Sequence, residues 1–359
     1  MHRVQVLSGH LSTNNRVGMR QSSASAAAPN DIAVVHGLRT AISRAKRGSF
    51  KLLSAVMSAV LKDVGLRPSL LGDVCVVDLL QRMGAVRITI VQNVESMSLR
   101  SPNNPGDLSP RLMDDEKTRD CIIPMGITSE NVAERFGITR EAQDHFALSS
   151  QQKVAMAQKK GLFDQEITPV TTKFVDENGT ERTITVTKDD GIRPGTTFEG
   201  LAKLRPAFKE TGSTTAGVHI QVSDGAAAVL IGWRSTVEKL GLPVFGVLRA
   251  SAVVGVPLDV MGIGPAYAIP EALNQAGLTV DDIDVFEINE AFASQAVYCV
   301  EKLGIPMEKV NPNGGAIALG HPLGCTGCCV LCCRGYGVVS MCIGTGMGAA
   351  AVFEFPGQC

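Results

Sequence analysis

Two stretches of the chain follow the same pattern. AVLKDVGLRPSLLGDVCV (residues 59–76) parallels EALNQAGLTVDDIDVFEI (271–288). Each runs from helical spacing through Gly-Leu and a short polar turn to Asp-Val and an apolar strand, with one residue of slip between them. A repeat of this kind indicates two copies of one α/β unit. We therefore expect a duplicated α/β fold.

The composition limits the kinds of partner. The 359 residues are 45% hydrophobic, which is ample for a core, and the net charge is −1. This balance leaves no electrostatic footprint for nucleic acid or for an anionic membrane, so neither is expected as a partner. The longest charge-free stretches, near 310–333 and 335–353, are broken by repeated glycines. We read them as buried strands and loops and expect no membrane span.

The segment between the two copies is more polar and richer in helical patterns. A helical run begins at Ser129-Glu130, and a longer one covers Thr139–Lys159. Alternating β-branched and charged residues around Asn178-Gly179 predict a hairpin over Thr168–Thr187. The expected organisation is a targeting tail at 1–30, a first α/β unit at 31–98, an inserted loop subdomain at 99–220 and a second α/β unit at 221–359.

The first 30 residues contain arginines but no Asp or Glu, and they end in a small-residue linker. Arg3-Val4, five further residues and His10-Leu11 are similar to the type 2 peroxisomal targeting signal, so residues 3–11 are expected to bind a peroxisomal import receptor. Two alternatives stay open: a mitochondrial-type presequence, which would direct the chain to the matrix, and a disordered tail with chance matches.

Five of the ten cysteines fall within residues 325–333. A secreted disulfide framework would spread them out, so we expect free thiols in a reducing compartment. The repeated C-x-x-C spacing leaves a metal or redox thiol cluster at 325–333 as an alternative function. A short Cys-rich turn that fills the core explains the same residues, and no metal site is expected.

Three loop clusters in the last third of the chain could carry chemistry. Asn289 begins Asn-Glu-Ala-Phe after a buried strand, His321 ends a Gly-rich loop, and Cys342 stands at a strand end before Gly-Thr-Gly-Met-Gly. Loops at strand ends of an α/β sheet can converge in one crevice. There an imidazole transfers protons, a thiol can act as acid or nucleophile, and an amide can orient a water or stabilise an oxyanion.

Longer motifs surround these clusters and extend beyond them: IPMGITSENVAERFG (123–137), QVSDGAAA (221–228), VVGVPLDVMGIGPAYAIP (253–270), INEAFASQA (288–296), GGAIALGHPLGCTG (314–327) and CIGTGMGAAAVFEF (342–355). With these motifs the chain resembles the thiolase family, over most of its length from about Asp31 onward. The resemblance implies a layered α-β-α-β-α fold, a homodimer, and thiolytic cleavage of 3-ketoacyl-CoA to acetyl-CoA and a shortened acyl-CoA in fatty-acid β-oxidation. Coenzyme A is then a co-substrate, and no bound cofactor is implied.

The resemblance also assigns roles to single residues. His321 would activate a nucleophilic cysteine, Cys342 would carry the proton of the acetyl α-carbon, and Asn289 would hold a water in the oxyanion hole. Two further positions would approach coenzyme A. Arg205 matches a basic position, although it is equally explained as a solvated charge, and Ser251 carries a hydroxyl one residue away from its place in the family.

The chain departs from the family at the nucleophile. Family members carry this cysteine in a segment like N-x-x-C-S-S-G, and nothing of that form occurs here. Only Val77–Asn93 separates the first strand from Val-Glu-Ser-Met-Ser, which is too short for the missing strand, turn and helix. Cys75 and Cys121 are not expected to substitute. The first unit is thus expected to be truncated, and a catalytically inactive protein that binds CoA thioesters or pairs with a thiolase remains an alternative.

Overall fold

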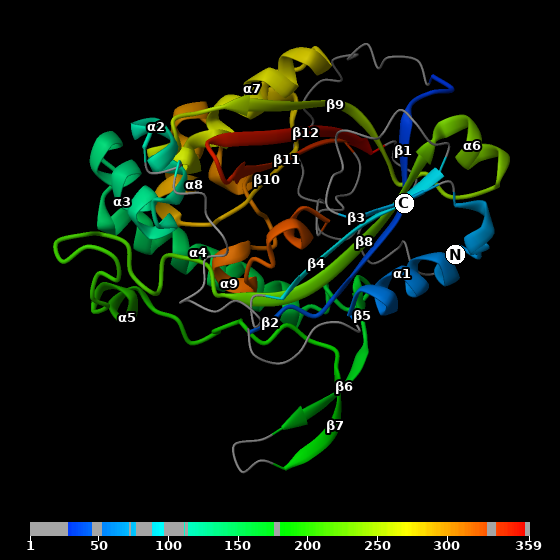
Figure 1. Ribbon diagram of the computed structural model, residues 1–359, viewed down its shortest axis with the longest axis horizontal. Coiled ribbons are helices and arrows are strands. Elements are labelled where there is room, and N and C mark those ends of the chain that lie inside the picture. Colours follow the sequence, from blue (N-terminus) through cyan, green and yellow to red (C-terminus); the bar gives the residue numbers. More distant parts are fainter. Residues whose placement is uncertain are drawn as a thin grey trace, which may run out of the picture.

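The computed structural model describes residues 28–44, 52–71, 73–76, 88–96, 111, 114–175, 180–328 and 335–355. Most of the described strands join one sheet, and helices cover it (Figure 1). The strands are β1 (Ile32–Thr40), β2 (Ser43–Arg44), β3 (Asp73–Val76), β4 (Ile88–Ser96), β5 (Ile167–Thr168), β6 (Val170–Val175), β7 (Glu181–Val186), β8 (Ser223–Trp233), β9 (Gly246–Gly255), β10 (Val285–Ile288), β11 (Gly335–Ile343) and β12 (Met347–Phe355). The helices are α1 (Leu52–Asp63), α2 (Glu116–Arg119), α3 (Met125–Phe136), α4 (Arg140–Lys159), α5 (Phe198–Ala202), α6 (Arg234–Lys239), α7 (Gly264–Ala276), α8 (Ala293–Leu303) and α9 (Ala316–Leu319), with 3-10 turns that include η6 (Leu258–Ile263) and η9 (Leu323–Cys328).

The sheet confirms the duplication that the sequence repeat predicts. Its strand order is β10-β11-β12-β9-β1-β8-β4-β3. Read inward from either end, each half begins with a parallel pair (β10 with β11, β3 with β4) and continues with two antiparallel pairs. The halves meet where β1 and β9 pair antiparallel. The chain is therefore two copies of one α/β unit joined edge to edge.

Strand β8 follows the inserted segment in sequence, but its partners β1 and β4 belong to the first unit. The first unit's sheet thus takes in a strand from beyond the boundary expected at 220. After β4 the chain passes through the inserted helices and returns as β8 to complete that half. The remaining boundaries of the expected division stay predictions.

The two units differ in what connects their parallel strands. In the second unit residues 289–334 separate β10 from β11, and they include α8, α9 and a strand-like bridge from Val310 to Phe286 of β10. In the first unit only residues 77–87 separate β3 from β4, and these residues lie outside the described part. A strand rises about 3.3 Å per residue and a helix about 1.5 Å, so this connection has no length for a comparable strand and helix.

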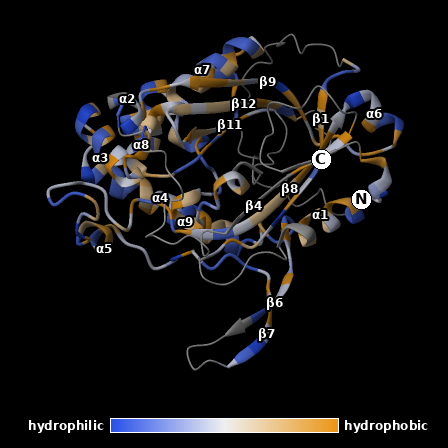
Figure 2. Ribbon diagram, viewed as in Figure 1, coloured by the Kyte–Doolittle hydropathy of each residue, from blue (hydrophilic) through white to orange (hydrophobic). Residues whose placement is uncertain are grey.

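The inserted segment supplies helices that pack on the second unit. Helix α4 matches the predicted run, with the Thr139 hydroxyl capping it by accepting from the Ala142 backbone N–H at 3.1 Å. Helix α3 begins at Met125, directly after Pro124 and four residues before the predicted start. Figure 2 shows that α3 carries both hydrophilic and hydrophobic residues, as a helix with one buried face does. The predicted hairpin is confirmed as β6 and β7, which project from the body of the molecule (Figure 1).

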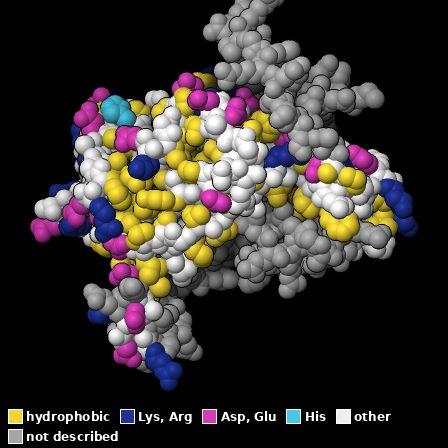
Figure 3. Space-filling model, turned by 90° about the horizontal axis from the view of Figure 1, so that it is seen from above, with side chains coloured by type: hydrophobic (Ala, Val, Ile, Leu, Met, Phe, Trp, Pro, Cys, Tyr) yellow, Lys and Arg dark blue, Asp and Glu magenta, His cyan; other side chains and the backbone are white. Residues whose placement is uncertain are grey.

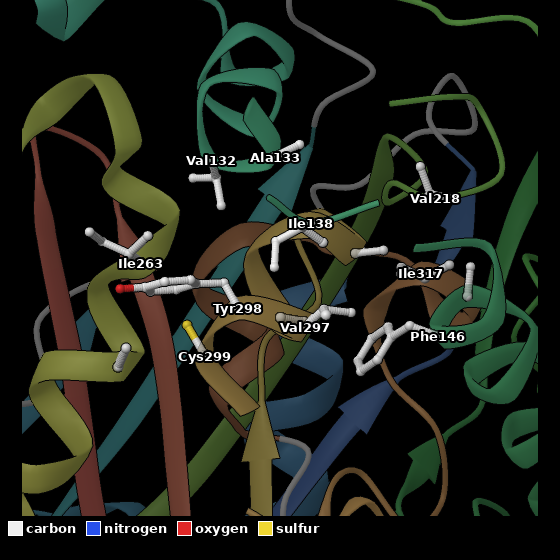
Figure 4. Close-up of a cluster of buried hydrophobic side chains, with 14 of the residues drawn as sticks. Val132, Ala133, Ile138, Phe146, Val218, Ile263, Val297, Tyr298, Cys299 and Ile317 are labelled. Atoms are coloured by element: carbon white, nitrogen blue, oxygen red, sulfur yellow. The ribbon is translucent and has the colours of Figure 1, made fainter. Parts of the chain in front are cut away.

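A hydrophobic cluster packs α8 against these helices. Figure 4 shows Val132 and Ala133 from α3, Phe146 from α4, and Tyr298 and Cys299 from α8 converging on one buried region. Because α8 begins directly after the Asn289–Phe292 turn, this packing fixes the direction in which the turn leaves β10.

A buried arginine ties the first unit to the inserted segment. The Arg39 guanidinium on β1 donates two hydrogen bonds to the Asp189 carboxylate, at 2.7 and 3.0 Å, and one to Glu166 at 2.7 Å. Asp189 also accepts from the Ile42 backbone N–H at 2.7 Å. Burial raises the pKa of Glu166, and the nearby Arg39 charge opposes that shift.

Several expectations concern the surface and the ends of the chain. Within the described ranges, no helix is long and apolar enough to cross a membrane, and His, Cys, Asp and Glu side chains form no group of three suited to a metal. Seen from above, the described surface has hydrophobic areas with basic and acidic side chains scattered among them (Figure 3). Cys325 is buried. The expected targeting signal at 3–11 and residues 329–333 of the cysteine cluster lie outside the described residues.

Candidate active site

Asn289 and Cys342 stand at neighbouring strand ends. Strands β10 and β11 are parallel, with Ile288 opposite Ser340. The backbone N–H of Asn289 donates to the Ser340 carbonyl at 2.9 Å, which extends this pairing by one residue. Cys342 follows Ser340 by two residues on β11. The carboxyl ends of adjacent parallel strands meet at one edge, where α/β proteins bind ligands.

His321 reaches Asn289 from a different loop. The imidazole Nε2 lies 3.3 Å from the Asn289 amide nitrogen Nδ2, and Nδ1 lies 2.6 Å from the Thr326 hydroxyl. An amide NH2 can only donate, so Nε2 is the acceptor and the ring proton sits on Nδ1, where it is held by Thr326. This arrangement leaves the basic lone pair of His321 on the side that faces Asn289.

Glycine lets the His321 loop pass close to the first unit. Gly320 has a φ of 105°, and a Cβ at this position would lie 2.2 Å from the Ser223 hydroxyl on β8. Pro322 in turn approaches Gly225 of the same strand, and η9 packs on β4 and β8. The imidazole is thus placed where the second unit faces the first unit.

The protonation states of the two reactive groups are set by burial. His321 is only 9% exposed, and loss of solvent lowers its pKa to about 4, so the imidazole is a neutral base at pH 7. Cys342 is half-buried, and burial raises the pKa of its thiol to about 11. A thiol that stays protonated is suited to give a proton and is a poor nucleophile.

The lowered pKa of His321 has a consequence for stability. As the pH falls from about 6.5 toward about 4, the unfolded chain takes up the proton first, so the free energy of unfolding decreases. Between about pH 7 and about pH 5 this one group should cost about 2 kcal/mol. Urea unfolding of the wild type and of His321→Gln checks this, because the variant should lose about that much less. Equal losses in both proteins would show that His321 is not buried and neutral.

Of the five residues expected in the site, the structure places three close to one another. Asn289 and His321 are in contact, and Cys342 stands at the adjacent strand end. Ser251 of β9 is paired with Ala351 of β12, which is paired in turn with Val339 of β11. Val339 precedes Cys342 by three residues, which is about 10 Å along the strand. Arg205 is exposed just after α5. Contacts of these last two residues with coenzyme A stay predictions.

Two features of the site were not singled out from the sequence. Thr326 orients the His321 ring, and Glu290, next to Asn289, is buried at 1% exposure. A charged residue between a strand that ends in Ile288 and the apolar start of α8 is the signal that could have pointed to Glu290. Asn289 Oδ1 is buried and accepts no hydrogen bond from the described residues.

The chain matches two family models in succession: thiolase, N-terminal domain, over residues 79–235, and thiolase, C-terminal domain, over residues 242–355. The chain belongs to the thiolase family. The two matched ranges divide this thiolase between β8 and β9, which is where the strand pairing also separates the units.

Several relatives resemble this thiolase over all or most of its length. The human protein "3-ketoacyl-CoA thiolase, peroxisomal" is 58% identical, with 100% of both chains covered. "3-ketoacyl-CoA thiolase 1, peroxisomal" of Arabidopsis thaliana is 46% identical over 90% of this chain and 88% of its own. The crystal structure of the dimeric peroxisomal thiolase of Saccharomyces cerevisiae superposes with a TM-score of 0.79 at 40% identity, covering 91% of this chain and 98% of that one.

The human alignment also measures what this thiolase lacks. It runs over 424 positions, while this chain has 359 residues, so at least 65 positions hold no residue of this chain. The short connection between β3 and β4 is one place where residues are missing relative to the second unit.

Proposed function

We propose that the substrate of this thiolase is 3-ketoacyl-CoA, which undergoes thiolytic cleavage in peroxisomal β-oxidation. We further propose that the chain binds this thioester but does not turn it over. The reaction class is supported by the named relatives, which are 3-ketoacyl-CoA thiolases of peroxisomes. The observation that carries the proposal is the set of Asn289, His321 and Cys342 at two adjacent strand ends and one loop.

These groups supply the proton-transfer part of thiolysis. A thiolate attacks the 3-keto carbon, and the bond between C2 and C3 then breaks with its electron pair on the α-carbon of acetyl-CoA. That carbanion needs a proton, and a Cys342 thiol with a pKa near 11 can donate it. The neutral His321 can take the proton of the attacking thiol, and Asn289 can orient a water or a substrate oxygen.

The attacking thiol is what this chain lacks. No segment of the family's nucleophile form occurs in the sequence, and the connection that would carry it is 77–87 alone. Cys342 is held protonated by burial, and burial likewise raises the pKa of Cys299. A thioester-binding protein without turnover is therefore favoured over an active enzyme.

We also propose that this chain forms a homodimer and is imported into peroxisomes. The yeast relative is dimeric by its title. Apolar side chains exposed on this chain, such as Val253 at 51% and Tyr267 at 47%, offer surface that a second copy could cover. Import through residues 3–11 agrees with the peroxisomal relatives.

Calorimetric titration with 3-ketooctanoyl-CoA tests the binding part of the proposal. We expect a Kd between about 1 μM and 1 mM, the usual range for enzyme substrates. His321→Ala should weaken binding by about tenfold or more, because it removes a polar contact in a buried site. The control Lys173→Ala alters an exposed pair on the projecting hairpin and should bind as the wild type does. Absence of binding up to about 1 mM would contradict the proposal.

A further inference from the structure

A buried carboxylate lies directly behind the site. Glu290 follows Asn289 in the turn that leaves β10, and it is 1% exposed. Its Oε2 accepts from the Ser150 hydroxyl at 2.6 Å and from the Ile317 backbone N–H at 3.1 Å. Its Oε1 accepts from the Asn311 amide at 2.7 Å. One side chain thus joins α4, α9 and the loop that precedes α9.

Two of these donors are fixed by further contacts. The Asn311 amide accepts from the Ile288 backbone N–H at 2.8 Å and donates to the Ile288 carbonyl at 3.0 Å, which sets its orientation. The Ser150 hydroxyl accepts from the Gly315 N–H at 3.1 Å. A Cβ on Gly315 would lie 2.3 Å from the Glu290 carboxyl carbon, so only glycine allows this approach.

The network leads directly to the reactive groups. Ile317 lies in the first turn of α9, which ends at Leu319, and Gly320 and His321 follow at once. Glu290 is also the residue that directly follows Asn289 in the chain. We propose that Glu290 is a positioning residue that holds Asn289 and His321 in contact by anchoring both of their segments. The inference rests on the proposed function only in giving those two residues a role.

The site requires a group that only accepts hydrogen bonds. The Asn311 amide cannot turn without losing both bonds to Ile288, and the Ile317 N–H can only donate. A glutamine at position 290 would therefore set its own NH2 against one of these donors. Burial raises the pKa of Glu290, while the three donors and the nearby Lys153 charge favour the ionised form.

The test is an NMR titration of the His321 imidazole, which reports on the surroundings of the ring and needs no substrate. The signals of this ring are assigned as those missing from the spectrum of His321→Gln. In the wild type the pKa should be about 4. In Glu290→Gln the α9 segment loosens and water reaches the ring, so the pKa should rise by at least about one unit. The matched control is Glu287→Gln, three residues away on β10, where Glu287 makes no hydrogen bond with a described side chain. Burial raises the pKa of Glu287 to about 8, so this substitution replaces a carboxyl that is mostly neutral near pH 7.

Binding of 3-ketooctanoyl-CoA is measured on the same proteins, and Glu290→Gln should weaken it by about tenfold while the control does not. Ser150→Ala, which removes a single hydroxyl on α4, gives a second variant if Glu290→Gln fails to fold, and its His321 pKa should rise in the same direction. A folded Glu290→Gln or Ser150→Ala protein whose His321 titrates as in the wild type overturns the inference. An equal shift in Glu287→Gln overturns it too. A normal pKa response without thioester binding in any protein would refute the proposed function and leave the positioning role intact.

Discussion

Thiolysis of 3-ketooctanoyl-CoA by this chain is expected to be at least about 10⁴-fold slower than by the human peroxisomal relative assayed beside it. Removing the nucleophile of a covalent enzyme costs about this much or more, even when the base and the oxyanion groups remain. Here His321 and Asn289 are in contact, but among the described residues no thiolate stands ready to attack, because burial holds Cys342 protonated.

The measurement is the release of acetyl-CoA with saturating coenzyme A. His321→Ala is the internal control: if the residual rate does not come from the site, this variant should change it by less than about twofold. A rate within about 100-fold of the human relative that also falls in His321→Ala would mean that another sulfur of this chain serves as the nucleophile.

The second large effect is on stability. Arg39→Ala should lower the free energy of unfolding by about 3–5 kcal/mol, because it leaves the buried Asp189 carboxylate without its guanidinium partner. Glu166, which Arg39 also contacts, loses the charge that opposes its desolvation. The three groups join β1 to the inserted segment, so the loss should appear as a lower urea midpoint of the whole chain.

The matched control is Arg135→Ala, which breaks the ion pair with Asp259. This arginine is half exposed, and solvent-exposed pairs contribute about 0–1 kcal/mol. If Arg39→Ala costs no more than this control, Arg39 does not anchor β1 to the inserted segment.

The sequence was sufficient for the features that depend on local pattern. The repeat between 59–76 and 271–288 predicted the duplicated sheet, since helix, turn and strand follow one another within each copy. The spacing from Thr139 to Lys159 and the Asn178-Gly179 turn signal predicted α4 and the hairpin for the same reason.

What the sequence could not supply were contacts between distant segments. The return of β8 to the first unit depends on pairing with β1, nearly 200 residues earlier, and no local pattern encodes it. The Glu290 network likewise joins Ser150 and Asn311, which are far apart in sequence. Asn289, His321 and Cys342 were found because each carries a reactive group on a Gly-rich loop or strand end, whereas Glu290 acts through groups that it supports.

The central claim is that this thiolase keeps the base, the amide and the proton donor of an acyl-transfer site and lacks the sulfur that attacks. Intact-protein mass spectrometry tests it directly, after acid quenching of the chain with 3-ketooctanoyl-CoA in the absence of free coenzyme A. The account predicts an unmodified mass at substrate concentrations that saturate binding. A hexanoyl adduct on any cysteine, lost in His321→Ala, would contradict it.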